Sequence, residues 1–273
     1  MSFGPLVSGE WLAAQLDDVR VVDVRWSAPG MSPDARSGRA AYERGHIPGA
    51  VWLDIDSDLS DPASAAEGRH PLPTPERFAA ALGRVGIAKG ARVVAYDDAG
   101  GSTAARLWWL LHVLDEPIAV LDGGLAAWPG ELTRGAPVVV PVERRMQPWP
   151  PERFVTADQV AATTSAAVLD ARTAQRYAHG DSAIDPRPGH VPGALSAPWA
   201  GNLESDGRFR SADELRRRFA AVTGRPVIAY CGSGITACHD LLALELAGRT
   251  DTALYPGSFS QWGADESRPV ETT

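Results

Sequence analysis

The chain carries one series of short motifs twice, in the same order. The first copies are Val21–Arg25, Gly45–Ala50, Val93–Asp97 and Leu121–Trp128, and the second copies are Val168–Arg172, Gly189–Ala194, Val227–Cys231 and Tyr255–Trp262. Chance matches would not keep both the order and the spacing. A repeat of this length indicates two complete domains rather than a solenoid of short repeats. The 273 residues are enough for two domains of ordinary size.

Each half alternates short apolar segments with segments that carry helix-start signals. Thr156–Gln159 and Ser211–Glu214 match the capping box, and Thr74 precedes a proline at a first helical position. Strands rich in β-branched residues that alternate with capped helices predict an α/β fold, with a parallel sheet flanked by helices in each half. The predicted domains cover residues 1–135 and 154–273, and a proline-rich extended linker over 136–153 joins them.

The composition argues against several classes of function. Apolar residues make up 44% of the chain and charged residues 22%, as in soluble globular proteins. No stretch approaches the roughly 18 apolar residues that a membrane span needs. The N-terminus has no basic region followed by an apolar run, so we expect a cytoplasmic protein with no membrane partner. The net charge of -8 argues against a nucleic-acid partner.

The segment Cys231–Ala237 reads CGSGITA and is the most informative motif; we call it the cysteine loop. It follows the apolar run Val227–Tyr230 and precedes a helical pattern, which places Cys231 at the end of a buried strand. Glycines let such a loop curl so that N–H groups point inward, and these groups can hold an anionic sulfur together with the helix dipole. The loop therefore predicts a nucleophile rather than a merely packed cysteine.

The two halves differ at this nucleophile. Asp97 stands in the first half where Cys231 stands in the second. Because a carboxylate cannot carry a transferable sulfur, we expect the first domain to be non-catalytic. Cys238 lies about two helical turns after Cys231 and is interpreted as a core residue, with a resolving thiol as the lesser alternative. The chain has neither a Cys/His cluster nor a phosphate-binding glycine motif, so we expect no metal and no cofactor.

The paired halves, the GH(I/V)PGA motif in each of them and the cysteine loop resemble the two-domain rhodanese sulfurtransferases. The resemblance runs from about Leu6 to Trp262 and is closest to the 3-mercaptopyruvate sulfurtransferases, whose loop reads CG(S/T)GVTA. Thiosulfate-specific rhodaneses typically have basic residues where this chain has Gly232 and Ser233. The resemblance implies covalent catalysis through a persulfide on Cys231.

The resemblance also implies which residues serve the reaction. Arg176 and Arg187 match the arginines that bind the carboxylate and carbonyl of mercaptopyruvate, a task suited to guanidinium forks. Asp56 and His70 resemble the family's proposed partners of the loop serine, Ser233 here, in a proton relay. The implied site residues are Cys231, Ser233, Asp56 and His70 for catalysis, and Arg176, Arg187, Gly232, Gly234, Ile235 and Thr236 for substrate binding.

Some repeated charged residues are interpreted as structural. His46 and His190 recur in both halves although only one half has the nucleophile, so we expect their rings to hydrogen-bond the local backbone. Arg172 competes with Arg176 as a substrate ligand. Its twin Arg25 in the non-catalytic half favours a structural pairing instead.

The sequence thus predicts an enzyme that moves sulfur from 3-mercaptopyruvate to cyanide or to a thiol acceptor, such as a thioredoxin-like protein. The neutral residues Gly232 and Ser233 favour this donor, because thiosulfate is a dianion and would gain more from a cationic loop. Two alternatives stay open, a thiosulfate:cyanide sulfurtransferase and a non-catalytic persulfide carrier. A dual-specificity phosphatase would need an arginine at position 237, where this chain has Ala237.

Overall fold

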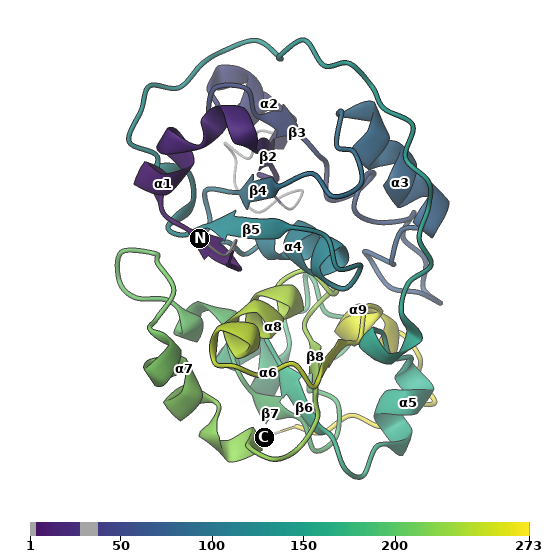
Figure 1. Ribbon diagram of the computed structural model, residues 1–273. Helices are drawn as coiled ribbons and strands as arrows, with labels where there is room; N and C mark the ends of the chain where they lie inside the picture. The colour runs from purple at the N-terminus through teal and green to yellow at the C-terminus, as the bar shows by residue number, and fades with distance from the viewer. Residues whose placement is uncertain (1–3, 28–37, 273) are drawn as a thin grey trace. The chain divides into compact units, whose positions relative to one another are not determined.

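The computed structural model describes residues 4–27 and 38–272, and its contacts divide the chain into two units (Figure 1). Unit 1 comprises Met1–Ser60, Pro73–Pro148 and Ser205–Arg208, and unit 2 comprises Asp61–Leu72, Trp149–Glu204 and Phe209–Thr273. Each unit has its own parallel β-sheet flanked by helices. The predicted fold class, two tandem α/β domains, is confirmed.

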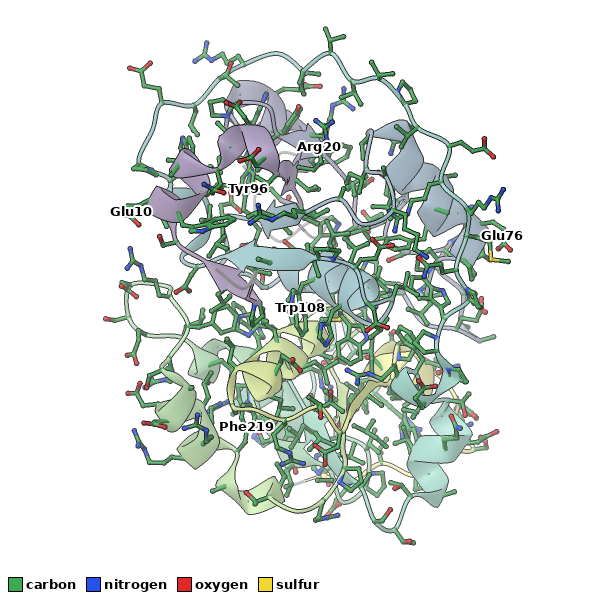
Figure 2. All side chains as sticks on the ribbon, in the orientation of Figure 1. Glu10, Arg20, Glu76, Tyr96, Trp108 and Phe219 are labelled. Carbon is green, nitrogen blue, oxygen red and sulfur yellow. The ribbon has the colours of Figure 1, made fainter. Side chains whose placement is uncertain are left out.

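Unit 1 is built on a five-stranded sheet with the order β1-β5-β4-β2-β3. Its strands are β1 (Leu6–Val7), β2 (Arg20–Asp23), β3 (Val51–Trp52), β4 (Val93–Tyr96) and β5 (Ile118–Leu121). Its helices are α1 (Gly9–Ala14), α2 (Gly38–Arg44), α3 (Pro75–Arg84) and α4 (Ala104–His112), with the 3-10 helices η1 (Leu16–Asp18) and η2 (Gly124–Ala127). Tyr96 on β4 and Trp108 on α4, both labelled in Figure 2, are buried.

Unit 2 has a four-stranded sheet with the order β7-β6-β8-β9. Its strands are β6 (Ala167–Asp170), β7 (Leu195–Ser196), β8 (Val227–Tyr230) and β9 (Thr252–Leu254). Its helices are α5 (Ala157–Ala162), α6 (Ala174–His179), α7 (Ala212–Arg218), α8 (Ala237–Leu246) and α9 (Ser258–Trp262), with the 3-10 helices η3 (Pro151–Arg153), η4 (Trp199–Asn202) and η5 (Ala220–Val222). Every residue of β6, β8 and β9 is buried, as parallel sheets covered on both faces require.

The predicted helix starts are present. The side chains of Thr156 and Ser211 each accept a hydrogen bond from the backbone N–H three residues on. The side chains of Gln159 and Glu214 accept one in turn from the backbone N–H of the cap residue, so both capping boxes are complete. Thr74 accepts from the N–H of Arg77 ahead of α3. These caps satisfy N–H groups that a helix end would otherwise leave unpaired.

The two units repeat one buried ion pair. The groups are Asp23, Arg25 and Tyr96 in unit 1, and Asp170, Arg172 and Tyr230 in unit 2. In each unit the arginine binds both carboxylate oxygens through Nε and Nη2, and the tyrosine hydroxyl donates to the same carboxylate at 2.6 Å. This geometry supports the structural interpretation of Arg172, because its guanidinium is already engaged at the end of β6.

The repeated histidines bind backbone, as predicted. Nδ1 of His46 lies 2.8 Å from the carbonyl oxygen of Tyr42, and Nδ1 of His190 lies 3.0 Å from that of Tyr177. Each ring also stacks on the same tyrosine, with centroids 4.0 and 3.7 Å apart. These histidines therefore tie the turn before a strand to the preceding helix in both units.

The bounds of the two units differ from the predicted domain boundaries in three places. Residues 61–72 leave the N-terminal half and belong to unit 2, and residues 205–208 belong to unit 1. The segment that we expected to be a linker runs with unit 1 as far as Pro148. There the N–H of Val142 donates to the carbonyl of Gly83, and Arg144 forms a buried ion pair with Glu116 at 2.9 Å.

Residues 4–27 and 38–272 contain neither a membrane-spanning helix nor a cluster of metal ligands. Within these ranges no helix combines the length and the apolar character needed to cross a bilayer. The same part of the chain has no group of three or more His, Cys, Asp or Glu side chains placed to hold a metal ion.

Candidate active site

Cys231 follows directly on β8, and its sulfur lies within the cysteine loop. Its Sγ accepts hydrogen bonds from the backbone N–H groups of Ser233 at 3.4 Å and Gly234 at 3.1 Å. The residue is 2% exposed. Parallel α/β sheets bind their ligands at the carboxyl ends of their strands, which is where Cys231 lies. The inward-pointing N–H groups that the sequence predicted are therefore present around this thiol.

Glycine is required at position 234 of the loop. Its φ is +80°, and a Cβ there would lie 2.5 Å from the carbonyl oxygen of Pro256. Only a residue without a side chain combines this backbone with so close an approach. The N–H of Gly234 reaches the sulfur of Cys231 because the chain turns at this point.

Ser258 holds the backbone of the nucleophile. Its Oγ accepts from the N–H of Cys231 at 3.1 Å and donates to the carbonyl of Tyr255 at 2.9 Å. Ser258 has φ +52°, whereas the matching residue of unit 1, Gly124, has φ +59°. A non-glycine residue in this region is strained, so unit 2 keeps a hydroxyl where unit 1 relieves the strain with glycine.

The remaining loop residues lie beside the sulfur or at the start of α8. Ser233 is buried, and within the described residues its Oγ has no hydrogen-bond partner, so it can meet a substrate. Ile235 is buried, and Thr236 is the N-cap residue of α8 without a side-chain cap. Cys238 is the second residue of α8 and is fully buried, and its thiol donates to the carbonyl of Gly234 at 3.4 Å.

Arg176 lies over the cysteine loop. It sits on α6 behind the Thr173 N-cap, and its Nε and Nη2 bind the two carboxylate oxygens of Asp185 at 2.9 and 2.5 Å. A Cβ built on Gly232 would lie 2.8 Å from Nη2 of Arg176. The buried carboxylate fixes this guanidinium next to the loop, where an anionic substrate could reach it.

One nitrogen of the Arg187 guanidinium binds backbone carbonyls. Its Nη2 donates to the carbonyl oxygens of Trp262, Asp265 and Arg268, at 3.3, 2.8 and 2.6 Å. These carbonyls lie at and beyond the end of α9, where unpaired acceptors are expected. The Nε of Arg187 is buried without a hydrogen-bond partner within the described residues, and its contact with a substrate stays a prediction.

Arg69 is a site residue that the sequence did not indicate. It belongs to the 61–72 segment, yet a Cβ on Gly232 would lie 2.9 Å from its Nη2. Its Nη1 donates to the carbonyl of Ile184 at 2.8 Å. Burial and the positive charge of Arg176 lower the pKa of Arg69. The only sequence signal was its place next to His70.

Asp56 and His70 belong to different units. Asp56 is in unit 1, where one carboxylate oxygen accepts from the indole N–H of Trp26 at 2.9 Å. His70 is in unit 2, where it follows Arg69 and is 8% exposed. The proton relay that joins them to Ser233 stays a prediction.

The twin loop of unit 1 encloses a carboxylate. Oδ1 of Asp97 accepts from the N–H groups of Ala99 and Gly101, both at 2.8 Å. Oδ2 accepts from the N–H groups of Thr103 and Ala104 at 2.8 and 2.9 Å, and from the Thr103 hydroxyl at 3.0 Å. The same scaffold therefore surrounds an anion with N–H donors in the half that lacks the thiol.

A buried acid lies on the helix that follows the loop. Asp240 is fully buried, Oδ1 accepts from the amide of Asn202 at 2.6 Å, and Oδ2 has no hydrogen-bond partner within the described residues. Burial raises the pKa of Asp240 to about 7, against the opposing effects of Asn202 and Arg218. The folded protein thus binds a proton that an unfolded aspartate releases near pH 4.

We expect Asp240→Asn to stabilise the protein at high pH only. Since the folded-state pKa is raised, wild-type stability falls as the pH rises from about 4 to 7 and then stays low. The variant has no charge to bury, so its advantage should grow over this window to at most about 4 kcal/mol. Urea unfolding at pH 4.5, 6 and 8 measures it. Asp213→Asn on exposed α7 is the control, and a pH-independent difference for Asp240→Asn would contradict the prediction.

This chain is similar to known proteins over both units. The chain matches the family Rhodanese-like domain twice, over residues 8–131 and 156–265. It is 43% identical to a probable 3-mercaptopyruvate sulfurtransferase of Pseudomonas aeruginosa, covering 100% of this chain and 99% of that protein. It is 35% identical to a putative thiosulfate sulfurtransferase, SseB, of Mycobacterium tuberculosis, covering 93% and 91%.

The fold is also similar to a solved structure. The crystal structure of SseA from Escherichia coli, a 3-mercaptopyruvate sulfotransferase, superposes with a TM-score of 0.81 at 35% identity. The superposition covers 93% of this chain and 98% of SseA. The similarity thus extends over both units, and includes the half that has no cysteine.

Proposed function

The chain belongs to the rhodanese-like family of sulfurtransferases, and from this premise we propose that it moves sulfur from 3-mercaptopyruvate through a Cys231 persulfide. The acceptor is a thiol or cyanide. The observation that carries the proposal is the pair of N–H groups, from Ser233 and Gly234, directed at the sulfur of Cys231. They stabilise a negative charge there before and after sulfur is taken up.

The first half-reaction loads the enzyme. The Cys231 thiolate attacks the sulfur of 3-mercaptopyruvate, a sulfur–sulfur bond forms, and the carbon–sulfur bond breaks. The electron pair of that bond stays with the carbon as the enolate of pyruvate. A proton then converts the enolate to pyruvate, and we assign its delivery to Ser233, with His70 and Asp56 as further members of the relay.

The second half-reaction returns the enzyme to its starting state. An acceptor thiolate attacks the outer sulfur of the persulfide, and Cys231 leaves as a thiolate. A thioredoxin-like protein or a small thiol supplies the acceptor in this proposal, in a cytoplasmic setting. The two halves together give ping-pong kinetics. A non-catalytic persulfide carrier would instead take sulfur from a protein donor and turn over no small donor.

The donor is held by its anionic end. Arg176 is fixed by Asp185 beside Gly232, so one guanidinium is available where a carboxylate of the donor would lie if its sulfur met Cys231. Relatives over the full chain length are named for 3-mercaptopyruvate, which supports this donor.

Thiosulfate is the second candidate donor. The loop side chains are neutral, but Arg69 and Arg176 both place a guanidinium within 3 Å of a Cβ position on Gly232. The neutral loop is therefore a weaker argument against thiosulfate, a dianion, than it is from the sequence alone. A relative at 35% identity carries the name of a putative thiosulfate sulfurtransferase.

We expect kcat/KM to be at least about tenfold higher for 3-mercaptopyruvate than for thiosulfate, with cyanide as the common acceptor. The reason is that a planar carboxylate matches a guanidinium fork and the keto group stabilises the departing carbanion. Steady-state kinetics with both donors on one enzyme preparation measures the ratio. Equal or higher kcat/KM for thiosulfate would replace 3-mercaptopyruvate with thiosulfate as the assigned donor.

A further inference from the structure

We propose that Arg69 is a specificity-determining residue of the sulfur-donor site, where it and Arg176 together bind the donor's carboxylate or other oxyanion group. The proposal deepens the function proposed above and rests on it for the identity of the donor. It begins from a segment of the N-terminal half that packs within unit 2.

The 61–72 segment is anchored so that Arg69 faces the cysteine loop. Gly68 has φ +94°, and a Cβ on it would lie 2.6 Å from the carbonyl oxygen of Gly257. The backbone N–H of Arg69 donates to the hydroxyl of Ser260 at 3.0 Å, and the side chain of Gln261 donates to the carbonyl of Ala66 at 2.5 Å. The segment thus lies against the turn and first residues of α9, which also contact the nucleophile's loop.

The guanidinium of Arg69 is oriented but not neutralised. Its Nη1 donates a hydrogen bond to the carbonyl of Ile184, whereas its Nη2 points toward Gly232. Within the described residues no carboxylate forms an ion pair with Arg69, whereas Arg176 is paired with Asp185. The Arg69 side chain therefore brings to the loop a positive charge that no ion pair within the described residues neutralises.

Two guanidiniums held this close repel each other unless an anion lies between them. Burial of Arg69 and the repulsion by Arg176 both lower the pKa of Arg69, against the opposing effects of Cys231 and Asp185. A donor whose oxyanion group bridges the two forks would relieve this repulsion and gain charge-assisted hydrogen bonds from both. Gly232 leaves the required space, because a side chain there would collide with both Nη2 atoms.

Alkylation of Cys231 tests the charge without requiring turnover. In a Cys238→Ser background Cys231 is the only thiol, since the chain has two cysteines. We expect Arg69→Gln to slow alkylation by anionic iodoacetate about tenfold and to change the rate with neutral iodoacetamide less than about twofold. Arg69→Lys should keep most of the iodoacetate rate. Arg216→Gln on exposed α7 removes the same charge away from the loop and should change neither rate.

Turnover then tests the role in donor binding. Arg69→Gln should raise KM for 3-mercaptopyruvate about tenfold or more, while the rate at which a loaded persulfide transfers to neutral dithiothreitol stays the same. Equal losses with iodoacetate and iodoacetamide, or no loss with either, would overturn the proposal. If the wild type does not use 3-mercaptopyruvate but the alkylation ratio responds as expected, the donor assignment fails and the anion site stands.

Discussion

Cys231→Ser should lose both the sulfur adduct and turnover. Wild-type protein incubated with 3-mercaptopyruvate should gain about 32 Da, the mass of one sulfur atom, and the variant should gain nothing. A serine hydroxyl is not ionised at neutral pH and cannot form a persulfide, so turnover should fall at least about a thousandfold. The N–H groups of Ser233 and Gly234 would still point at the substituted oxygen, which keeps the loop folded. Intact-protein mass spectrometry measures the adduct.

Cys238→Ser is the matched control for this experiment. Cys238 is fully buried and its thiol donates to the backbone carbonyl of Gly234 in the loop, a role that a serine hydroxyl can take over. We expect this variant to keep the adduct and most of the turnover. An adduct that survives in Cys231→Ser and disappears in Cys238→Ser would assign the sulfur to the wrong thiol and end the proposed mechanism.

Features of the fold that depend on local pattern could be predicted from the sequence. The capping boxes at Thr156 and Ser211 are short-range signals, and both are present. The buried strands could be predicted from their own content of β-branched residues. The register of the duplicated motifs was also sufficient to identify the pairing of Arg172 and the backbone contact of His190, because each had a twin in the non-catalytic half.

Features that depend on long-range packing could not be predicted. Arg69 reaches the cysteine loop because residues 61–72 pack against a turn almost 200 positions later in the chain. Nothing in the composition of that segment indicates its partner. For the same reason the neutral residues Gly232 and Ser233 do not describe the full charge at the loop, because Arg69 adds a cation from a distant segment.

Arg187 illustrates a different limit. The resemblance implies that Arg187 binds the donor, but its Nη2 is surrounded by three carbonyls from residues 262 to 268. The sequence shows a helix end only as a pattern, and it does not show which side chain will satisfy the unpaired carbonyls there. The resemblance in sequence therefore identified Arg187 as a residue of interest, but it did not show which groups surround its side chain.

Asp170→Asn should lower the free energy of unfolding of unit 2 by about 3–5 kcal/mol, the usual effect of leaving a buried charge without its partner. Arg172 is buried, its Nε and Nη2 both bind Asp170, and its guanidinium lies 4.0 Å from the ring of Phe259. The asparagine keeps the size of the side chain but not its charge. Asp185, 3.5 Å from Nη1 of Arg172, can compensate only in part because it also binds Arg176.

The duplication supplies the control for this prediction. Asp23→Asn removes the same carboxylate from the twin pair with Arg25 in unit 1. Because each unit has its own sheet and its own ion pair, Asp23→Asn should shift the unfolding transition of unit 1, and Asp170→Asn that of unit 2. Hydrogen exchange of β4 and β8 amides during urea unfolding separates the two. A loss below about 1 kcal/mol in Asp170→Asn would mean that Asp185 alone can hold the arginine, and that the repeated pair is not needed for the stability of this fold.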